Sequence, residues 1–196
     1  MSHMGDLVAE MLARYGVELV FGMPGGQTTA LHDGISRRTD RIRHVLMRDE
    51  RNAAYAADAY ARLTGKPGVC DVTVGPGANL LPAGFVEALN ASVPMVGIVG
   101  ELPLDWLTLK EKGIASQGFD QLSFFKTITK DSWLVPSVSA LPEMIRTAFR
   151  VATSPRPGPV ALIIPHDVFD AEWDETKIEI GVDDRAIRAP FVRAAP

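Results

Sequence analysis

The sequence predicts an α/β protein with three α/β/α layers and a mainly parallel, doubly wound sheet of about six strands. Two observations predict this fold. Short apolar runs of four to seven residues alternate regularly with segments whose apolar residues recur at helical spacing. No internal repeat or low-complexity tract interrupts this alternation. Strands connected in this way lie parallel, and helices must cover both faces of their sheet.

The first half of the chain predicts four helices and three strands. Leu7, Met11, Leu12 and Tyr15 recur at helical spacing, and Gly16 ends the first helix. The first four residues, MSHM, are given no structural role. The same reasoning predicts helices over residues 6–16, 27–38, 50–63 and 78–89, and strands over residues 17–22, 42–47 and 68–74.

The second half continues the alternation less regularly. We expect strands over residues 94–100, 126–130 and 158–165, a helix over residues 138–153, and an irregular stretch from Glu101 to about Gly118. From Trp173 onward the chain is charged and ends in alanine and proline. We therefore place one domain at residues 1–172 and a linker or C-terminal tail at residues 173–196.

Composition and charge disfavour two kinds of partner. The 196 residues are 46% hydrophobic, which allows a substantial core, and the formal charge is −4 with acidic and basic residues interspersed. No basic patch for nucleic acid and no membrane-spanning run is present in the sequence, so neither partner is expected. Cys70 is the only cysteine and lies in an apolar run, which predicts a buried thiol in a cytoplasmic protein.

Several common site classes lack their motifs. GPGANL (75–80) has Leu80 where a dinucleotide motif needs its third glycine, and neither a P-loop nor a G-x-S-x-G sequence is present. His3, His32, His44 and His166 show no metal-ligand spacing, and His44 lies in an apolar run typical of a core histidine. We therefore propose no metal site from the sequence.

Three loops carry unusual residues: GMPGGQ (22–27), RDE (48–50) and GPGANL (75–80). Taken singly, the glycines fit ordinary turns, and Glu50 fits the first turn of a helix, where the macrodipole favours a carboxylate by about 0.3–1 kcal/mol. All three loops, however, follow consecutive predicted strands. Because parallel strands bring their carboxyl ends to one edge, the loops are expected to converge on a ligand site there.

Together these segments resemble the N-terminal pyrimidine-binding domain of the acetolactate synthase-like thiamine diphosphate enzymes. The resemblance covers about residues 7–170 and rests on V-F-G-M-P-G-G, the glutamate-led alanine-rich helix, G-K-P-G-V, G-P-G-A and R-P-G-P-V in this order. It implies an enzyme that decarboxylates or carboligates a 2-oxo acid.

The resemblance also assigns site residues. It implies that Glu50 is catalytic: it binds N1′ of the cofactor's aminopyrimidine and promotes the imino form that takes the C2 proton. The implied cofactor contacts are Pro24, Gly25, Gly26, Glu50, Gly75, Pro76, Gly77, Ala78 and Asn79. The implied substrate side consists of Gly26, Gln27 and Gln117; for Gln117, an ordinary solvated loop residue is the alternative.

Three positions depart from the acetolactate synthase pattern. Asp49 stands where those enzymes have histidine, Met23 where they have an aromatic residue, and Leu80 where TVGPGANL should end in asparagine. These departures surround the implied active centre, so acetolactate synthase activity itself is left open.

The cofactor's diphosphate and its Mg²⁺ need a G-D-G motif, which this sequence lacks. The resemblance therefore implies a diphosphate-binding domain, in the same full-length protein or in a separate subunit, and a homodimer through the present domain. Three alternatives stay open: a fragment of a three-domain enzyme, the small subunit of a split 2-oxo acid decarboxylase, or a non-catalytic scaffold.

Overall fold

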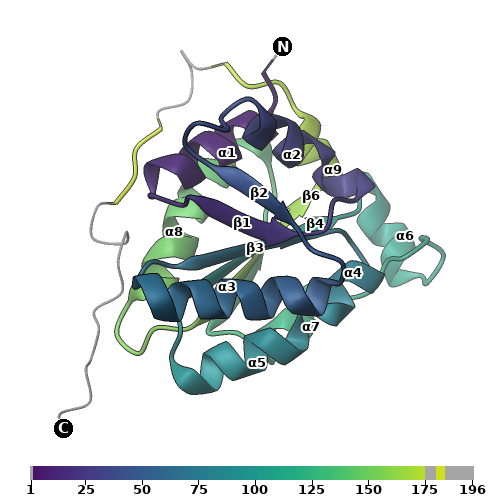
Figure 1. Ribbon diagram of the computed structural model, residues 1–196. Helices are drawn as coiled ribbons and strands as arrows, with labels where there is room; N and C mark the ends of the chain where they lie inside the picture. The colour runs from purple at the N-terminus through teal and green to yellow at the C-terminus, as the bar shows by residue number, and fades with distance from the viewer. Residues whose placement is uncertain (1, 175–179, 184–196) are drawn as a thin grey trace, which may run out of the picture.

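The computed structural model describes residues 2–174 and 180–183 and confirms the predicted fold class (Figure 1). Six strands form one all-parallel sheet in the order β2-β1-β3-β4-β6-β5. The strands are β1 (Leu19–Gly22), β2 (Arg43–Leu46), β3 (Gly68–Val72), β4 (Met95–Glu101), β5 (Asp131–Leu134) and β6 (Pro159–Pro165). The central strands β3, β4 and β6 are buried along their whole length, which explains their near-continuous apolar sequences.

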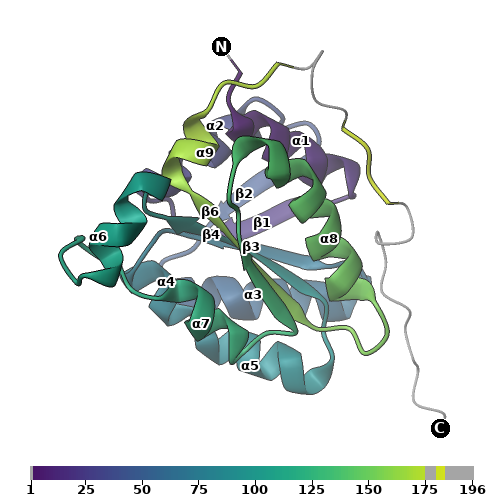
Figure 2. The same ribbon diagram turned by 180° about the vertical axis from the view of Figure 1, so that it is seen from behind.

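Helices cover both faces of the sheet (Figures 1 and 2). One face packs against α1 (Met4–Arg14), α2 (Thr29–Ser36), α8 (Leu141–Thr153) and α9 (His166–Asp170), and the other against α3 (Glu50–Thr64), α5 (Pro82–Ala91) and α7 (Gln121–Lys126). Short elements lie in the connections: η1 (Gly26–Thr28), α4 (Pro76–Leu80), η2 (Leu104–Trp106), α6 (Leu107–Glu111) and η3 (Val138–Ala140).

Successive strand residues point to opposite faces, so each strand contributes to two cores. On β3, Val69 belongs to the core beneath α1 and α8, whereas Cys70 and Val72 belong to the core beneath α3 and α5. The thiol of Cys70 is free and fully buried, as predicted. Ala53 and Ala57 of α3 are also fully buried against their own sheet, which accounts for the small residues on that helix.

Two predicted elements in the second and third quarters of the sequence are wrong. Residues 126–130 form no strand: Thr127 and Ile128 donate to carbonyls of α7 in hydrogen-bonded turns, and β5 begins only at Asp131. The predicted helix 78–89 is two helices, because Pro82 has no N–H to continue the hydrogen-bond ladder.

Other elements were not predicted. The supposedly irregular stretch after Glu101 contains η2 and α6, and α7 and α9 are too short for a clear apolar period. The first four residues also have a role: Met4 is fully buried, and the backbone N–H of Met4 donates to the Ala171 carbonyl at 2.8 Å. Trp173 packs into the core too, while the rest of the predicted tail at 175–179 and 184–196 lies outside the described residues.

No helix in the described part of the chain is long and apolar enough to cross a membrane.

Candidate functional site

The three predicted loops do meet at the carboxyl edge of the sheet, where the strands β1, β2 and β3 end (Figure 1). The first and third loops are joined by a side-chain hydrogen bond: Thr73 Oγ1 donates to Gln27 Oε1 at 2.6 Å. The second and third loops meet at Glu50, because a β-carbon added to Gly77 would lie 3.1 Å from Glu50 Oε1. The three loops therefore lie next to one another, as expected from the parallel order of their strands.

Glu50 is the first residue of α3 but does not cap this helix. The N-cap is Asp49, whose Oδ1 accepts the backbone N–H of Arg51 at 2.9 Å. Side-chain and backbone hydrogen bonds from Arg51 lower the pKa of Asp49 to about 2. The N-cap hydrogen bond at the helix start is thus supplied by the neighbouring carboxylate, while Glu50 occupies the first turn, where the macrodipole favours a negative charge.

The Glu50 side chain is nearly buried, with 8% of its surface exposed. Among residues 2–174 and 180–183, nothing forms a hydrogen bond or ion pair with its carboxylate. A nearly buried carboxylate that no neighbouring side chain engages calls for an explanation, and ligand binding is one. Its location next to Gly77, where no side chain intervenes, leaves its acceptor oxygens directed at a glycine-lined surface.

Gly75 supports the third loop in a conformation that favours glycine. Its φ is +69°, and a β-carbon there would lie 2.5 Å from the Gln117 carbonyl oxygen. This contact brings Gln117 to the loop. Gln117 itself has a φ of +63° and an exposed side chain.

Gln121 is a positioning residue that the sequence reasoning missed. This fully buried side chain accepts the Gly75 N–H through Oε1 at 3.2 Å and donates from Nε2 to the Gly100 carbonyl at 3.1 Å. It therefore ties the third loop to the end of β4. In the sequence, Gln121 is simply a glutamine that precedes an apolar segment. This pattern is too common to show that the residue holds the third loop.

A buried ion pair borders the same edge. Glu101, at the end of β4, accepts from Lys110 Nζ at 2.7 Å and also binds the Leu102 N–H. Both charged groups are largely enclosed, so the pair fixes α6 beside the strand end. The sequence reasoning had left this segment as irregular chain.

The remaining predicted contacts occupy several environments. Gly77 and Ala78 are buried in α4, whereas Pro24, Gly26, Pro76 and Asn79 are exposed. Leu80, which replaces the expected asparagine, is half-buried at the end of α4. The structure therefore brings the predicted residues to one edge, with Glu50 and Gly77 in direct proximity and Asn79 facing outward.

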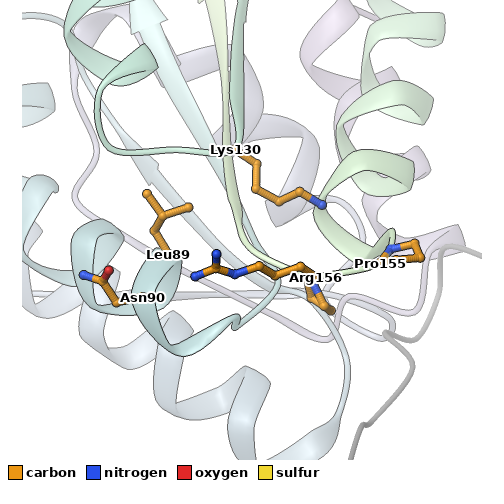
Figure 3. A pocket seen from close by; sticks show the side chains of 6 residues that line it. Leu89, Asn90, Lys130, Pro155 and Arg156 are labelled. Carbon is orange, nitrogen blue, oxygen red and sulfur yellow. The ribbon is translucent and has the colours of Figure 1, made fainter.

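A pocket of about 420 Å³ lies at the opposite, amino edge of the sheet (Figure 3). Its cations are already engaged: Lys130 Nζ donates to the Val151 carbonyl at 2.6 Å, and Arg156 Nε donates to Ser92 Oγ at 3.3 Å. Burial lowers the pKa of Lys130. The pocket is lined by Leu89, Asn90, Lys130, Pro155, Arg156 and Pro157 and is separate from the three loops.

Residues 2–124 match the family described as thiamine pyrophosphate enzyme, N-terminal TPP binding domain. The chain belongs to this family. Thiamine pyrophosphate is the same cofactor as thiamine diphosphate, and the match runs from α1 into α7, including all three loops and Glu50.

Acetolactate synthases are among the relatives of this thiamine pyrophosphate-binding domain. It is 41% identical over 166 residues to acetolactate synthase 2, chloroplastic, of Brassica napus, covering 83% of this chain and 25% of that protein. It is 40% identical over 192 residues to the acetolactate synthase of Arthrospira platensis, covering 95% of this chain and 32% of that protein. The chain therefore spans about a quarter to a third of the length of these relatives.

Proposed function

We propose that this domain supplies the pyrimidine-binding half of an acetolactate synthase-like active site that acts on a 2-oxo acid, by decarboxylation, carboligation or both. The observation that carries the proposal is the Glu50 carboxylate, which is buried, unpaired within the described residues and next to Gly77. In this proposal Glu50 is the catalytic residue and the three loops form the cofactor's surroundings.

The proposed position of an aminopyrimidine ring is beside Glu50, where Gly77 places no side chain against the carboxylate. Gly75 and Ala78 are buried behind it and would support the loop that borders the ring. Pro24, Gly25 and Gly26 would border the ring on the β1 side, with Pro76 and Asn79 at its rim. Gly26, Gln27 and Gln117 would face the substrate.

Bound thiamine diphosphate supplies an electron sink for the loss of carbon dioxide from a 2-oxo acid. This chain would contribute the Glu50 carboxylate. Glu50 would share a proton with the ring nitrogen N1′ and so favour the imino form of the ring, which takes the C2 proton. Gln121 keeps the third loop in place through Gly75.

We place the diphosphate and its Mg²⁺ on a second domain, since the chain has no G-D-G motif. The length of the relatives supports a second domain in the same polypeptide over a separate subunit of a split decarboxylase. Exposed Tyr55 and Leu63 on α3 and Val86 on α5 support a homodimer through this face. A cytoplasmic location, which would keep the Cys70 thiol reduced, remains a prediction.

Replacement of Glu50 by glutamine in the complete assembly tests the proposal. Glutamine preserves shape and removes the proton-holding carboxylate, so kcat/KM should fall by about 10²–10⁴. Exchange of the C2 proton of bound thiamine diphosphate should slow in parallel. Glu143→Gln on the exposed side of α8, on the other face of the sheet, is the matched control and should leave both rates unchanged.

Two results would overturn the proposal. An E50Q assembly with full activity would point to a scaffold role, in which the carboxylate does no chemistry. Turnover of a 2-oxo acid by the present chain alone, with added thiamine diphosphate and Mg²⁺, would contradict its assignment as half of a site.

A further inference from the structure

Three side chains with metal-binding atoms meet on the face of the sheet opposite to Glu50. His32 comes from α2, His44 from β2 and Asp71 from β3, and one ligand atom of each lies within 4.8 Å of the other two. Asp71 is fully buried, while the side chains of His32 and His44 retain 16% and 13% of their exposure. The cluster is enclosed but reachable from solvent.

The strand pattern explains how residues so distant in sequence meet. Asp71 and Val69 point to the same face of β3, toward α1 and α2. Strand β1 lies between β3 and β2, and Gly22 is the β1 residue that pairs with Asp71. A β-carbon at Gly22 would overlap Oδ1 of Asp71. Glycine at this position lets the carboxylate cross β1 and reach His44 on β2.

The hydrogen bonding of the cluster is incomplete. Asp71 Oδ1 lies 2.7 Å from His44 Nε2, in the geometry of a hydrogen bond. Asp71 Oδ2 lies 2.9 Å from His32 Nε2, but these atoms do not meet hydrogen-bond geometry. Both are buried and have no hydrogen-bond partner elsewhere in the described part of the chain. His32 Nε2 and Asp71 Oδ2 are therefore in ionic contact but lack a well-formed hydrogen bond.

The electrostatics favour a cation at this point. Asp71 is fully buried, and its two carboxylate oxygens lie 2.7 Å from His44 Nε2 and 2.9 Å from His32 Nε2. A carboxylate at this depth is stabilised by a positive charge beside it. A proton on one imidazole or a bound metal ion can provide this charge.

We propose that His32, His44 and Asp71 form a binding site for a divalent transition-metal ion of the zinc class. Two imidazole nitrogens and one carboxylate oxygen are a three-ligand set that zinc accepts, with water in the fourth position. Tetrahedral bonds of about 2.0–2.1 Å place ligand atoms roughly 3.3 Å apart. The 2.7 and 2.9 Å separations run to different oxygens of Asp71, and the three ligand atoms lie within 4.8 Å of one another, so small side-chain rotations would bring them around one ion.

The ligand set also predicts selectivity. Mg²⁺ and Ca²⁺ prefer oxygen ligands and should bind weakly, whereas Zn²⁺ and Co²⁺ accept imidazole. Binding requires neutral imidazoles, so any proton carried by His32 Nε2 or His44 Nε2 passes to solvent as the metal–nitrogen bonds form. The ion would link α2, β2 and β3 through His32, His44 and Asp71. It would thereby stabilise the elements that flank the carboxyl end of β1, from which the first loop starts.

The test is titration of the chelator-treated 196-residue chain with Co²⁺, followed by absorption in the visible range, and with Zn²⁺ in competition with a chromophoric chelator. We expect one ion per chain, a tetrahedral cobalt spectrum and no comparable binding of Mg²⁺. His32→Asn and His44→Asn should each weaken Zn²⁺ binding by at least tenfold. His166→Asn is the matched control, because His166 and Asp170 form a similar pair 2.9 Å apart on the surface of α9.

The unmodified chain gives a second readout that does not depend on how the variants fold. On addition of Zn²⁺, the nitrogen NMR signals of His32 and His44 should shift while those of His166 stay in place. Absence of a cobalt spectrum, or equal binding by wild type and the His32→Asn/His44→Asn double variant, would overturn the proposal and leave the cluster holding a proton only. Neither readout involves thiamine diphosphate, so the result is independent of the proposed function.

Discussion

Gly77 and Glu50 bring the first turns of α4 and α3 together: a β-carbon on Gly77 would lie 3.1 Å from Glu50 Oε1 and 3.1 Å from Thr73 Cγ2. These distances are tighter than ordinary van der Waals contact, although both neighbours are side-chain atoms that can shift. The glycine at position 77 therefore leaves room beside the Glu50 carboxylate that any larger residue would fill.

Gly77→Ala should separate cofactor binding from stability. Alanine is favoured over glycine in a helix by about 1 kcal/mol, which offsets the crowding, so the free energy of unfolding should change by less than about 1 kcal/mol. The methyl group enters the space beside Glu50, so half-saturation of the complete enzyme should need about tenfold more thiamine diphosphate. Urea unfolding and cofactor titration measure the two effects. Unchanged cofactor affinity would contradict the proposed site.

Gly75→Ala should instead destabilise the fold. Alanine at a φ of +69° is strained, and its β-carbon would lie 2.5 Å from the Gln117 carbonyl. We expect the free energy of unfolding to fall by roughly 1–3 kcal/mol in urea titrations. Gly26→Ala is the control, since a β-carbon there has no neighbour within 4 Å, and the change should stay within about 0.5 kcal/mol. Equal effects of the two substitutions would refute this explanation.

Gln121→Leu should be destabilising because it leaves two buried backbone groups without partners. The Gly75 N–H and the Gly100 carbonyl lose their hydrogen bonds, at roughly 1–3 kcal/mol for each group left unpaired. Urea unfolding measures the loss, and hydrogen exchange of the Gly75 amide should accelerate. Protection of that amide at the wild-type level would show that Gln121 does not hold the loop.

Asp49 should contribute a pH-dependent part of the stability. Its folded-state pKa of about 2 lies below the ordinary value of 3.8, because Arg51 hydrogen-bonds the charged carboxylate. A lowered pKa means that the contribution is present above about pH 4 and is lost as the pH falls toward 2. The midpoint of urea unfolding should therefore differ between wild type and Asp49→Ala at pH 6 and converge at low pH. Asp49→Asn keeps a capping oxygen without a charge, so the stability of the helix start should lose this pH dependence.

Cys70 should be unreactive in the folded protein. Burial, reinforced by the negative charge of Asp71, raises the pKa of the thiol well above its usual value, so almost no thiolate forms at neutral pH. A thiol reagent such as dithionitrobenzoate should modify Cys70 only at the rate of unfolding, and completely in strong denaturant. Rapid stoichiometric modification under native conditions would show an opening of the core between β3 and α3.

The sequence was a good guide wherever a local pattern determines structure. Helix α3 and strands β3, β4 and β6 follow from apolar periodicity, and the convergence of the three loops follows from the geometry of a parallel sheet. Glu50 was found because a charge stood between an apolar run and a helix. The N-cap was not identified, because attention went to Glu50 and not to Asp49, although aspartate is the residue type that commonly caps helices.

The errors occurred where several weak signals compete. The β-branched residues in KTITK favour a strand, but Phe125 is buried and the turn after α7 uses this segment to reach the sheet. The grouping of His32, His44 and Asp71 depends on strand order and on the missing side chain of Gly22. Neither is visible as residue spacing, so the histidines were judged singly.

The two ends of the described domain are fastened together by main-chain contacts. Met4 donates to the Ala171 carbonyl, and the Trp173 N–H donates to the Ser2 carbonyl at 2.9 Å. During synthesis the apolar side of α1 therefore emerges from the ribosome long before β6 and α9, the elements that complete its surroundings, have been made. Until then the apolar side of α1 stays exposed in the nascent chain, where it can bind a chaperone or associate with another chain.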